Sequence, residues 1–114
     1  MMSSVRHFFS PERDELVLAD VLYALSDPTR LWIVTALAER GEQPCAAGGL
    51  ASIPKSTLAH HFKVLRETGV VLTRAEGTQS VNTLRRADLD ARFPGLLDAV
   101  LRAAPACPAE EPRS

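Results

Sequence analysis

Features that define several common protein classes are scarce in this sequence. Its two cysteines, Cys45 and Cys107, are too few for a disulfide framework. No stretch approaches the roughly 18 consecutive apolar residues of a transmembrane helix, so no membrane partner is expected. The first fifteen residues, MMSSVRHFFSPERDE, lack the apolar segment and the cleavage site of a signal peptide. These absences predict a cytoplasmic protein.

The sequence also lacks a recognisable catalytic constellation. No nucleophile–base pair and no pair of carboxylates stands out. The 114 residues fit a single domain, and a small helical domain seldom provides the enclosed pocket that a hydrolase needs. We therefore expect a protein that is not an enzyme.

Positive charge is not in excess, because 14 acidic residues offset the 13 lysines and arginines and give a net charge of −1. It is nevertheless concentrated in one segment. Residues 52–86 contain six basic and two acidic residues, whereas residues 1–27 contain two basic and five acidic residues. A basic segment of this kind is the electrostatic footprint that contact with a nucleic acid requires. The total charge is too small for strong non-specific binding by a monomer, and a dimer would double the contacts.

A helix with two different faces is predicted over about residues 54–68, within the stretch IPKSTLAHHFKVLRETG. Pro54 suits its first turn, and Gly69 suits the left-handed position just past its end. Its apolar stripe has the spacing of a buried face and consists of Leu58, Phe62 and Leu65. The outer face carries hydroxyls, an imidazole and an ammonium, which suit base edges and phosphates, or simply solvent.

The flanking segments make DNA binding the better interpretation of this helix. Upstream, residues 46–51 form a predicted short helix, and a short helix, a tight turn and a second helix make a helix-turn-helix. Downstream, strands predicted over 70–74 and 80–84 are joined by residues 75–79, which include a glycine for the turn. A hairpin over about residues 70–84 that follows the second helix is a wing.

Three motifs taken together, SDPTRLWIV, LASIPKSTLAHHFKVLRETGVV and RAEGTQSVNTL, resemble the winged helix-turn-helix of ArsR-type (ArsR/SmtB) bacterial transcriptional regulators. The resemblance covers roughly Ala24 to Leu84. It implies a mainly α fold with a two-stranded β-hairpin wing and a homodimer formed through the first and last helices. It also implies a repressor that binds a palindromic operator in double-stranded DNA, under the control of an effector or a separate sensor protein.

The predicted organisation is a flexible arm over residues 1–9, one winged helix-turn-helix domain over 10–103 and a disordered tail over 104–114. Ser10 and Pro11 suit the start of a first helix that runs to about residue 24. This helix has more apolar surface than one narrow stripe, which indicates either packing within the domain or contact with a second subunit. The resemblance implies that the helices over 11–24 and 94–103 form the dimer interface.

A second helix is expected to begin at Asp27 and Pro28 and to end at Gly41. Arg30 lies in its first turn, where its charge opposes the helix dipole. It is therefore expected to have a specific partner, and a phosphate or a carboxylate would each serve. His61, at the flank of the apolar stripe of the helix over 54–68, is expected to be structural.

The expected DNA contacts divide into three groups. The predicted readers of bases are Ser56, Thr57 and His60. The predicted contacts to phosphates are Lys55, Lys63 and Arg74 on the wing. The predicted contacts of the wing tip with the adjacent minor groove are Thr78 and Gln79. The main alternative from another class is a winged-helix protein-interaction module that does not bind DNA.

The resemblance also raises the question of metal sensing. Thiol-based metal sensors of the family carry a Cys-x-Cys pair where this chain has Cys45 alone, and one thiolate cannot form that site. Zinc and nickel sensors often place Asp and His on the last helix, which has no histidine here. Nickel or zinc could instead bind an imidazole and carboxylates across the dimer, namely His7, Glu12, Asp14 and Glu15. Ordinary solvation of these side chains is the alternative.

A redox switch is a further possibility that the resemblance suggests. Some family members sense oxidants or sulfide through one cysteine near the short helix and one in the last helix. Cys45 and Cys107 have roughly this placement, although Cys107 lies in the tail. Two unpaired thiols without a sensing role are the alternative.

Overall fold

The computed structural model describes residues 10–41, 43–44 and 53–104. The short helix expected over 46–51 and the candidate ligands His7, Cys45 and Cys107 lie outside these residues. None of the helices within the described ranges combines the length and the apolar character needed to cross a membrane.

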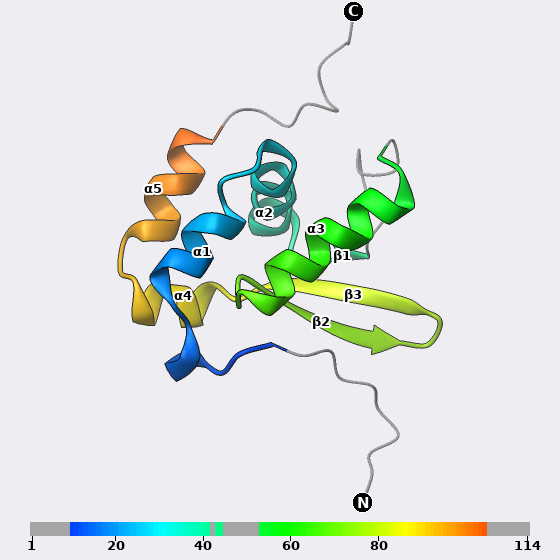
Figure 1. Cartoon of the computed structure of the whole chain (residues 1–114), viewed down its shortest axis with the longest axis horizontal. Coiled ribbons are helices and arrows are strands. Elements are labelled where there is room, and N and C mark those ends of the chain that lie inside the picture. Colours follow the sequence, from blue (N-terminus) through cyan, green and yellow to red (C-terminus); the bar gives the residue numbers. More distant parts are fainter. Residues whose placement is uncertain (1–9, 42, 45–52, 105–114) are drawn as a thin grey trace, which may run out of the picture.

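The described elements confirm a mainly α chain with a β-hairpin near its centre (Figure 1). In chain order they are η1 (Arg13–Glu15), α1 (Leu18–Ala24), α2 (Pro28–Arg40), β1 (Gln43–Pro44), α3 (Lys55–Glu67), β2 (Val71–Glu76), β3 (Gln79–Leu84), α4 (Arg86–Arg92) and α5 (Leu96–Ala103). In Figure 1, α3 lies alongside the hairpin of β2 and β3, and the hairpin turn lies at the edge of the molecule opposite α1 and α5.

The prediction of one continuous first helix over 11–24 is wrong. A 3-10 turn, η1, is followed by extended backbone at Leu16 and Val17, and α1 begins only at Leu18. The break turns the Leu16 side chain into the core, where it is 1% exposed. The Leu16 carbonyl, which a continuous helix would have paired internally, instead accepts a hydrogen bond from Nη2 of Arg92 at 2.7 Å. Packing and this long-range bond together outweigh local helix propensity.

The predicted cap at Ser10 is also wrong. Glu12 caps η1 through a capping box in which Oε1 of Glu15 accepts a hydrogen bond from the Glu12 amide at 2.8 Å. The Ser10 hydroxyl instead accepts a hydrogen bond from Nη1 of Arg85 at 2.8 Å. The same Nη1 donates to the Pro11 carbonyl at 2.6 Å, so Arg85 anchors the start of the described chain.

The start and end of α2 agree with the prediction. Oδ2 of Asp27 accepts hydrogen bonds from the amides of Thr29 and Arg30 at 2.8 and 3.1 Å, which is an N-cap. Gly41 ends the helix with a φ of 80°. Between them α2 is the central helix of the core, with four apolar side chains buried: Trp32, Ile33, Val34 and Leu37.

The sheet is antiparallel, with strand order β1-β3-β2. The hairpin pairs Val71 with Leu84 and continues to Glu76 and Gln79, so both strands are longer than predicted and the turn is shorter. Gly77, with a φ of 61°, makes this tight turn possible. β1 was not predicted: a two-residue strand that contains a proline carries no local strand signal.

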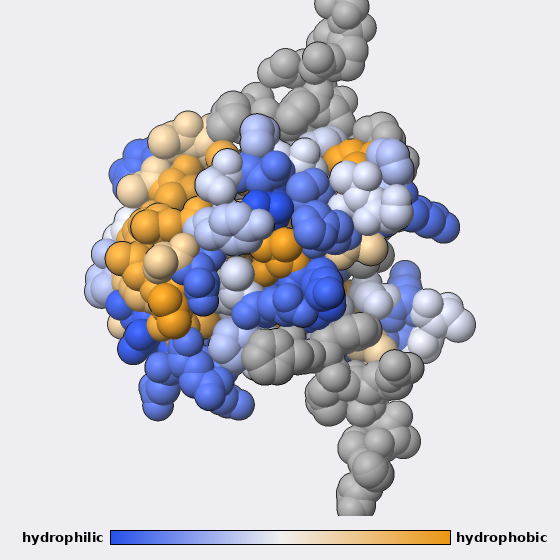
Figure 2. All heavy atoms as spheres, viewed as in Figure 1, coloured by the Kyte–Doolittle hydropathy of each residue, from blue (hydrophilic) through white to orange (hydrophobic). Residues whose placement is uncertain are grey.

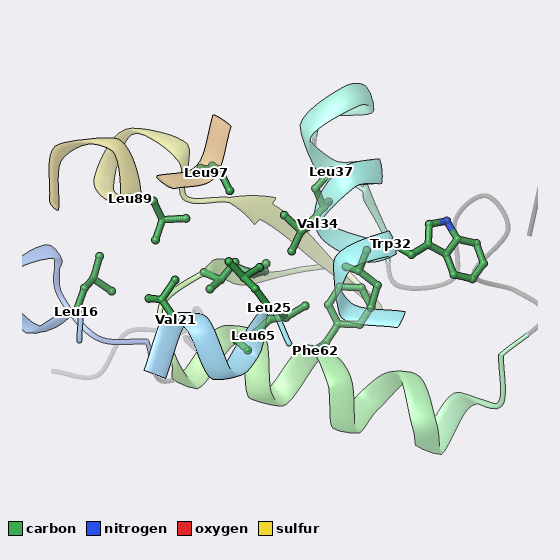
Figure 3. Packing of buried hydrophobic residues seen from close by; sticks show 14 of the residues in the cluster. Leu16, Val21, Leu25, Trp32, Val34, Leu37, Phe62, Leu65, Leu89 and Leu97 are labelled. Atoms are coloured by element: carbon green, nitrogen blue, oxygen red, sulfur yellow. The ribbon is translucent and has the colours of Figure 1, made fainter. Parts of the chain in front are cut away.

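One hydrophobic core joins the described α-helices, α1 to α5 (Figure 3). The apolar stripe of α3 is buried as predicted, with Leu58, Phe62 and Leu65 at most 4% exposed. Figure 3 shows side chains from α1, α2 and α3 pointing into one space, with Leu89 of α4 and Leu97 of α5 closing it from another side. Burial of one face of α3 leaves its opposite face to solvent.

Gly69 connects α3 to the hairpin, and both its backbone conformation and its close neighbours disfavour a larger residue there. Its φ is 91°, and a Cβ at this position would lie 2.1 Å from Cδ2 of Leu16. Gly69→Ala should therefore lower the free energy of unfolding by about 3 kcal/mol, from left-handed strain together with overpacking. Chemical denaturation of the purified protein measures this change.

Gly77→Ala is the matched control, because Gly77 also has a positive φ but a Cβ added there would meet nothing within 4 Å. We expect Gly77→Ala to lower the free energy of unfolding only by the cost of left-handed backbone, about 1 kcal/mol. Equal losses in the two variants would contradict the proposed packing of Leu16 against the junction.

Candidate nucleic-acid interface

The outer face of α3 carries the predicted contact residues. Five of them are exposed on α3: Lys55, Ser56, Thr57, His60 and Lys63. Helical spacing places Ser56, His60 and Lys63 opposite the buried stripe and Thr57 on its flank, whereas Lys55 lies in the first turn, closer to the line of the stripe. Glu67 ends the helix, and Gly69 follows with the expected positive φ, so the predicted range of 54–68 differs from α3 by one residue at each end.

The wing brings the predicted tip residues to the end of the hairpin but holds Arg74 in an ion pair. Thr78 lies in the turn and Gln79 begins β3, and both are exposed. The Arg74 guanidinium donates to Oε2 of Glu76 from Nε at 2.9 Å and from Nη2 at 2.6 Å. Strand alternation places Arg74 on the face of the hairpin opposite Thr73.

Fewer basic residues are available to bind DNA than the count over 52–86 suggests. Arg85 pairs with Asp88 at 2.9 Å, and Arg86 pairs with both Asp90 and Asp98. Together with the ion pair of Arg74, these contacts neutralise the arginines of the wing and of the segment after it. The available positive charge therefore lies mainly along α3.

A cleft of about 350 Å³ separates α3 from the wing, and we call it the helix–wing cleft. Its lining consists of Ala59, Phe62, Lys63, Arg66, Thr73, Ser80 and Asn82. On its floor, Oγ1 of Thr73 donates to Oδ1 of Asn82 at 2.7 Å, and both residues are buried. Sequence reasoning missed Arg66 and Ser80 here. The spacing of Arg66, three residues after Lys63, could have revealed the first of them.

Arg30 is a buried cation that joins three helices. It is 5% exposed, and its Nε donates to the carbonyl of Ala24 at 2.7 Å, at the C-terminal end of α1. Its guanidinium also lies 5.2 Å from the centre of the Tyr23 ring. The prediction that Arg30 binds a phosphate or a carboxylate is wrong, because it binds backbone carbonyls of α1 and a histidine of α3.

That histidine is His61, whose Nδ1 lies 3.1 Å from Nη1 of Arg30. Because a guanidinium can only donate, Nδ1 must accept, and the proton of the neutral ring lies on Nε2, 3.9 Å from Oδ2 of Asp27. Burial lowers the pKa of His61, as do the charges of Arg30 and His60, while Asp27 opposes the shift. His61 is therefore a structural residue, as predicted, whereas His60 is exposed.

The described residues contain no group of three or more His, Cys, Asp or Glu side chains that could hold a metal ion. Glu12, Asp14 and Glu15 are exposed around η1, and the Glu15 carboxylate already accepts a hydrogen bond from the Glu12 amide. Because His7 lies outside the described ranges, the nickel or zinc site stays a prediction.

An apolar surface covers α1. Four of its large side chains are 45–57% exposed: Val17, Leu18, Leu22 and Tyr23. Figure 2 shows hydrophobic side chains gathered over the region where Figure 1 places α1 and α5. A groove of about 270 Å³ continues this surface between α1, α2 and α5, lined in part by Leu22, Leu31 and Val100. Contiguous apolar patches of this kind mark interaction sites.

The chain matches a helix-turn-helix domain family over residues 25–74. It is 33% identical over 91 residues to the uncharacterized HTH-type transcriptional regulator YceK of Bacillus subtilis, an alignment that covers 78% of this chain and 91% of that protein. It is 39% identical over 61 residues to the uncharacterized HTH-type transcriptional regulator MJ1325 of Methanocaldococcus jannaschii, covering 53% of this chain and 68% of that protein.

The fold and the face of α3 define a winged helix-turn-helix protein. The chain belongs to the HTH-type transcriptional regulators. The predicted class, a DNA-binding transcriptional regulator, is confirmed.

The bond between Arg30 and His61 predicts how stability depends on pH. Because its pKa is lowered in the folded protein, His61 stays neutral to a lower pH there than in the unfolded chain, where its pKa is near the ordinary 6.5. The unfolded state therefore binds more protons as the pH falls through 6.5, and the free energy of unfolding should fall on acidification. Denaturant titrations between about pH 7.5 and pH 5 measure this slope.

His61→Asn retains an oxygen that can accept from Arg30 and removes the titrating ring, so its slope should be flatter than that of the wild type. His60→Asn, on the exposed face, is the control and should retain most of the wild-type slope. Identical slopes in the wild type and His61→Asn would contradict the assignment.

Proposed function

We propose that this protein is an ArsR-type repressor that binds a palindromic operator as a homodimer. The observation that carries the proposal is the polar and basic face of α3, exposed opposite a fully buried stripe and next to the wing. A helix held in this way can enter the major groove with its N-terminal residues at the base edges. The short helix before it, expected over 46–51, would cross the backbone.

Within this proposal the residues of α3 have separate tasks. The base readers are Ser56, Thr57 and His60, whose hydroxyls and imidazole suit hydrogen bonds in the groove. Lys55 and Lys63 hold phosphates on either side. Thr78 and Gln79 at the wing tip reach the adjacent minor groove. Arg74 contributes less than Lys63 does, because its charge is already paired with Glu76.

The apolar surface of α1 supports the dimer. With Leu22 at 45% and Tyr23 at 57% exposure, the monomer leaves a face that a second copy could cover. Pairing through α1 and α5 about a twofold axis would also place two copies of α3 on half-sites about one helical turn apart, or a multiple of that distance. The palindrome of the operator follows from the same axis.

Control by an effector completes the proposal. Nickel or zinc bound by His7, Glu12, Asp14 and Glu15 would lie beside α1 and could change how that helix packs. A thiol pair formed by Cys45 and Cys107 is the second candidate, and a separate sensor protein is the third. DNA titrations with each metal, with an oxidant and with neither distinguish the first two from the third.

Two substitutions on α3 test the division between base readers and phosphate contacts. Thr57→Ala should reduce discrimination between the operator and random DNA, because it removes a base contact worth about 1–3 kcal/mol. Lys63→Ala should weaken binding to every sequence and lower the slope of log affinity against log salt by about one. Fluorescence anisotropy on the upstream DNA and on a scrambled duplex measures both effects.

Equal losses on operator and scrambled DNA from Thr57→Ala would remove it from the base readers. Wild-type protein that shows no salt-sensitive DNA binding at all would instead favour the protein-interaction module.

Leu22→Glu tests the dimer. A carboxylate on the apolar surface of α1 should shift the sedimentation of the protein to that of a monomer while the helical circular dichroism signal is retained. Leu72→Glu is the matched control, since Leu72 on the wing is 44% exposed. A monomeric wild type, or a dimer that persists in Leu22→Glu, would contradict the α1 interface.

A further inference from the structure

The helix–wing cleft gathers positive charge at the edge of α3 that faces the wing. Lys63 and Arg66 approach it from α3, and Ser80 approaches it from β3. No carboxylate belongs to its lining among the described residues. Two cations and a hydroxyl around one hollow suit an oxyanion such as a phosphate.

The polar groups of the cleft differ in what they can still bind. Oγ1 of Thr73 and Oδ1 of Asn82 are bonded to each other, so this pair on the floor is internally satisfied. Lys63 forms no ion pair and Ser80 no side-chain hydrogen bond within the described residues. Lys63 is exposed and Ser80 is half-buried, whereas Thr73 and Asn82 are buried, so the donors of Lys63 and Ser80 are the ones that a ligand can reach.

The apolar residues of the lining indicate which chemical group binds next to the anion. Ala59 and Phe62 form a wall next to the cations, and the cleft has a volume of about 350 Å³. This volume is larger than a phosphate alone would fill, and an apolar wall suits the carbon face of a sugar. A deoxyribose with its phosphodiester combines both properties.

We propose that the helix–wing cleft holds one sugar–phosphate unit of the operator backbone, with the phosphate bound by Lys63, Arg66 and Ser80. This inference rests on the proposed function and adds two contact residues, Arg66 and Ser80, to it. With α3 in the major groove, the flanking strand passes between the helix and the wing, and the cleft clamps it. The clamp fixes the register of α3 without reading a base.

A double-mutant cycle between protein and DNA tests the clamp. Operators carrying a single neutral methylphosphonate at successive positions are titrated with the wild type, Arg66→Gln and Ser80→Ala. One position per half-site should cost the wild type about tenfold in affinity. At that position the same substitution should cost Arg66→Gln clearly less, because the charge that it neutralises has already lost its partner.

Ser80→Ala should weaken binding without changing the salt dependence, whereas Arg66→Gln should lower the slope by about one. Arg66→Lys retains the charge and should retain the slope. Arg40→Gln, at the exposed end of α2 and outside the proposed DNA and dimer surfaces, is the matched control and should behave as the wild type.

Each other outcome overturns the clamp in a distinguishable way. Wild-type binding to the operator with equal methylphosphonate costs in the wild type and Arg66→Gln would refute the clamp and leave the repressor intact. Absence of operator binding by the wild type would refute both. Equal methylphosphonate costs at every position of the half-site in the wild type would also refute the clamp, because it requires one phosphate to matter more than the others.

Discussion

The position of the recognition helix depends on one buried guanidinium. Arg30 donates to the carbonyl of Ala24 at the end of α1 and to the imidazole of His61 on α3, and its own helix begins at the Asp27 cap. Burying a cation is costly unless its donors are satisfied, so α1, α2 and α3 are favoured in the arrangement that satisfies them. That arrangement fixes which face of α3 reaches solvent. It also links the apolar surface of α1 to the helix proposed to read DNA.

Charge pairing explains how a chain of net charge −1 can present a basic surface. The acidic residues of α4 and α5 neutralise Arg85 and Arg86, and Glu76 neutralises Arg74. Lys63 is left on α3, beside the cleft into which Arg66 also projects. Binding energy would therefore come from the helix and the cleft more than from the outer face of the wing.

Local signals in the chain were enough to predict α2, α3 and the hairpin. Asp27 with Pro28, and Gly69 after an apolar stripe, are caps and periodicities that act within a few residues. The break at Leu16 had no such signal, because it depends on the packing of Leu16 beside Gly69 and on a bond to Arg92. The partner of Arg30 was missed for the same reason. His61 lies 31 residues away, and only the crossing of α2 and α3 brings the two together.

The sequence by itself determined where the central helices begin and end and which side of α3 is polar, since capping and periodicity are properties of neighbouring residues. The tertiary structure decided which of the basic side chains are neutralised by ion pairs within the protein and which can bind an anion. Arg13 forms an ion pair with Asp88, 75 residues along the chain, and Arg86 forms one with Asp98, 12 residues along the chain. Ion pairing depends on distance in space, and periodicity along the chain contains no information about that distance.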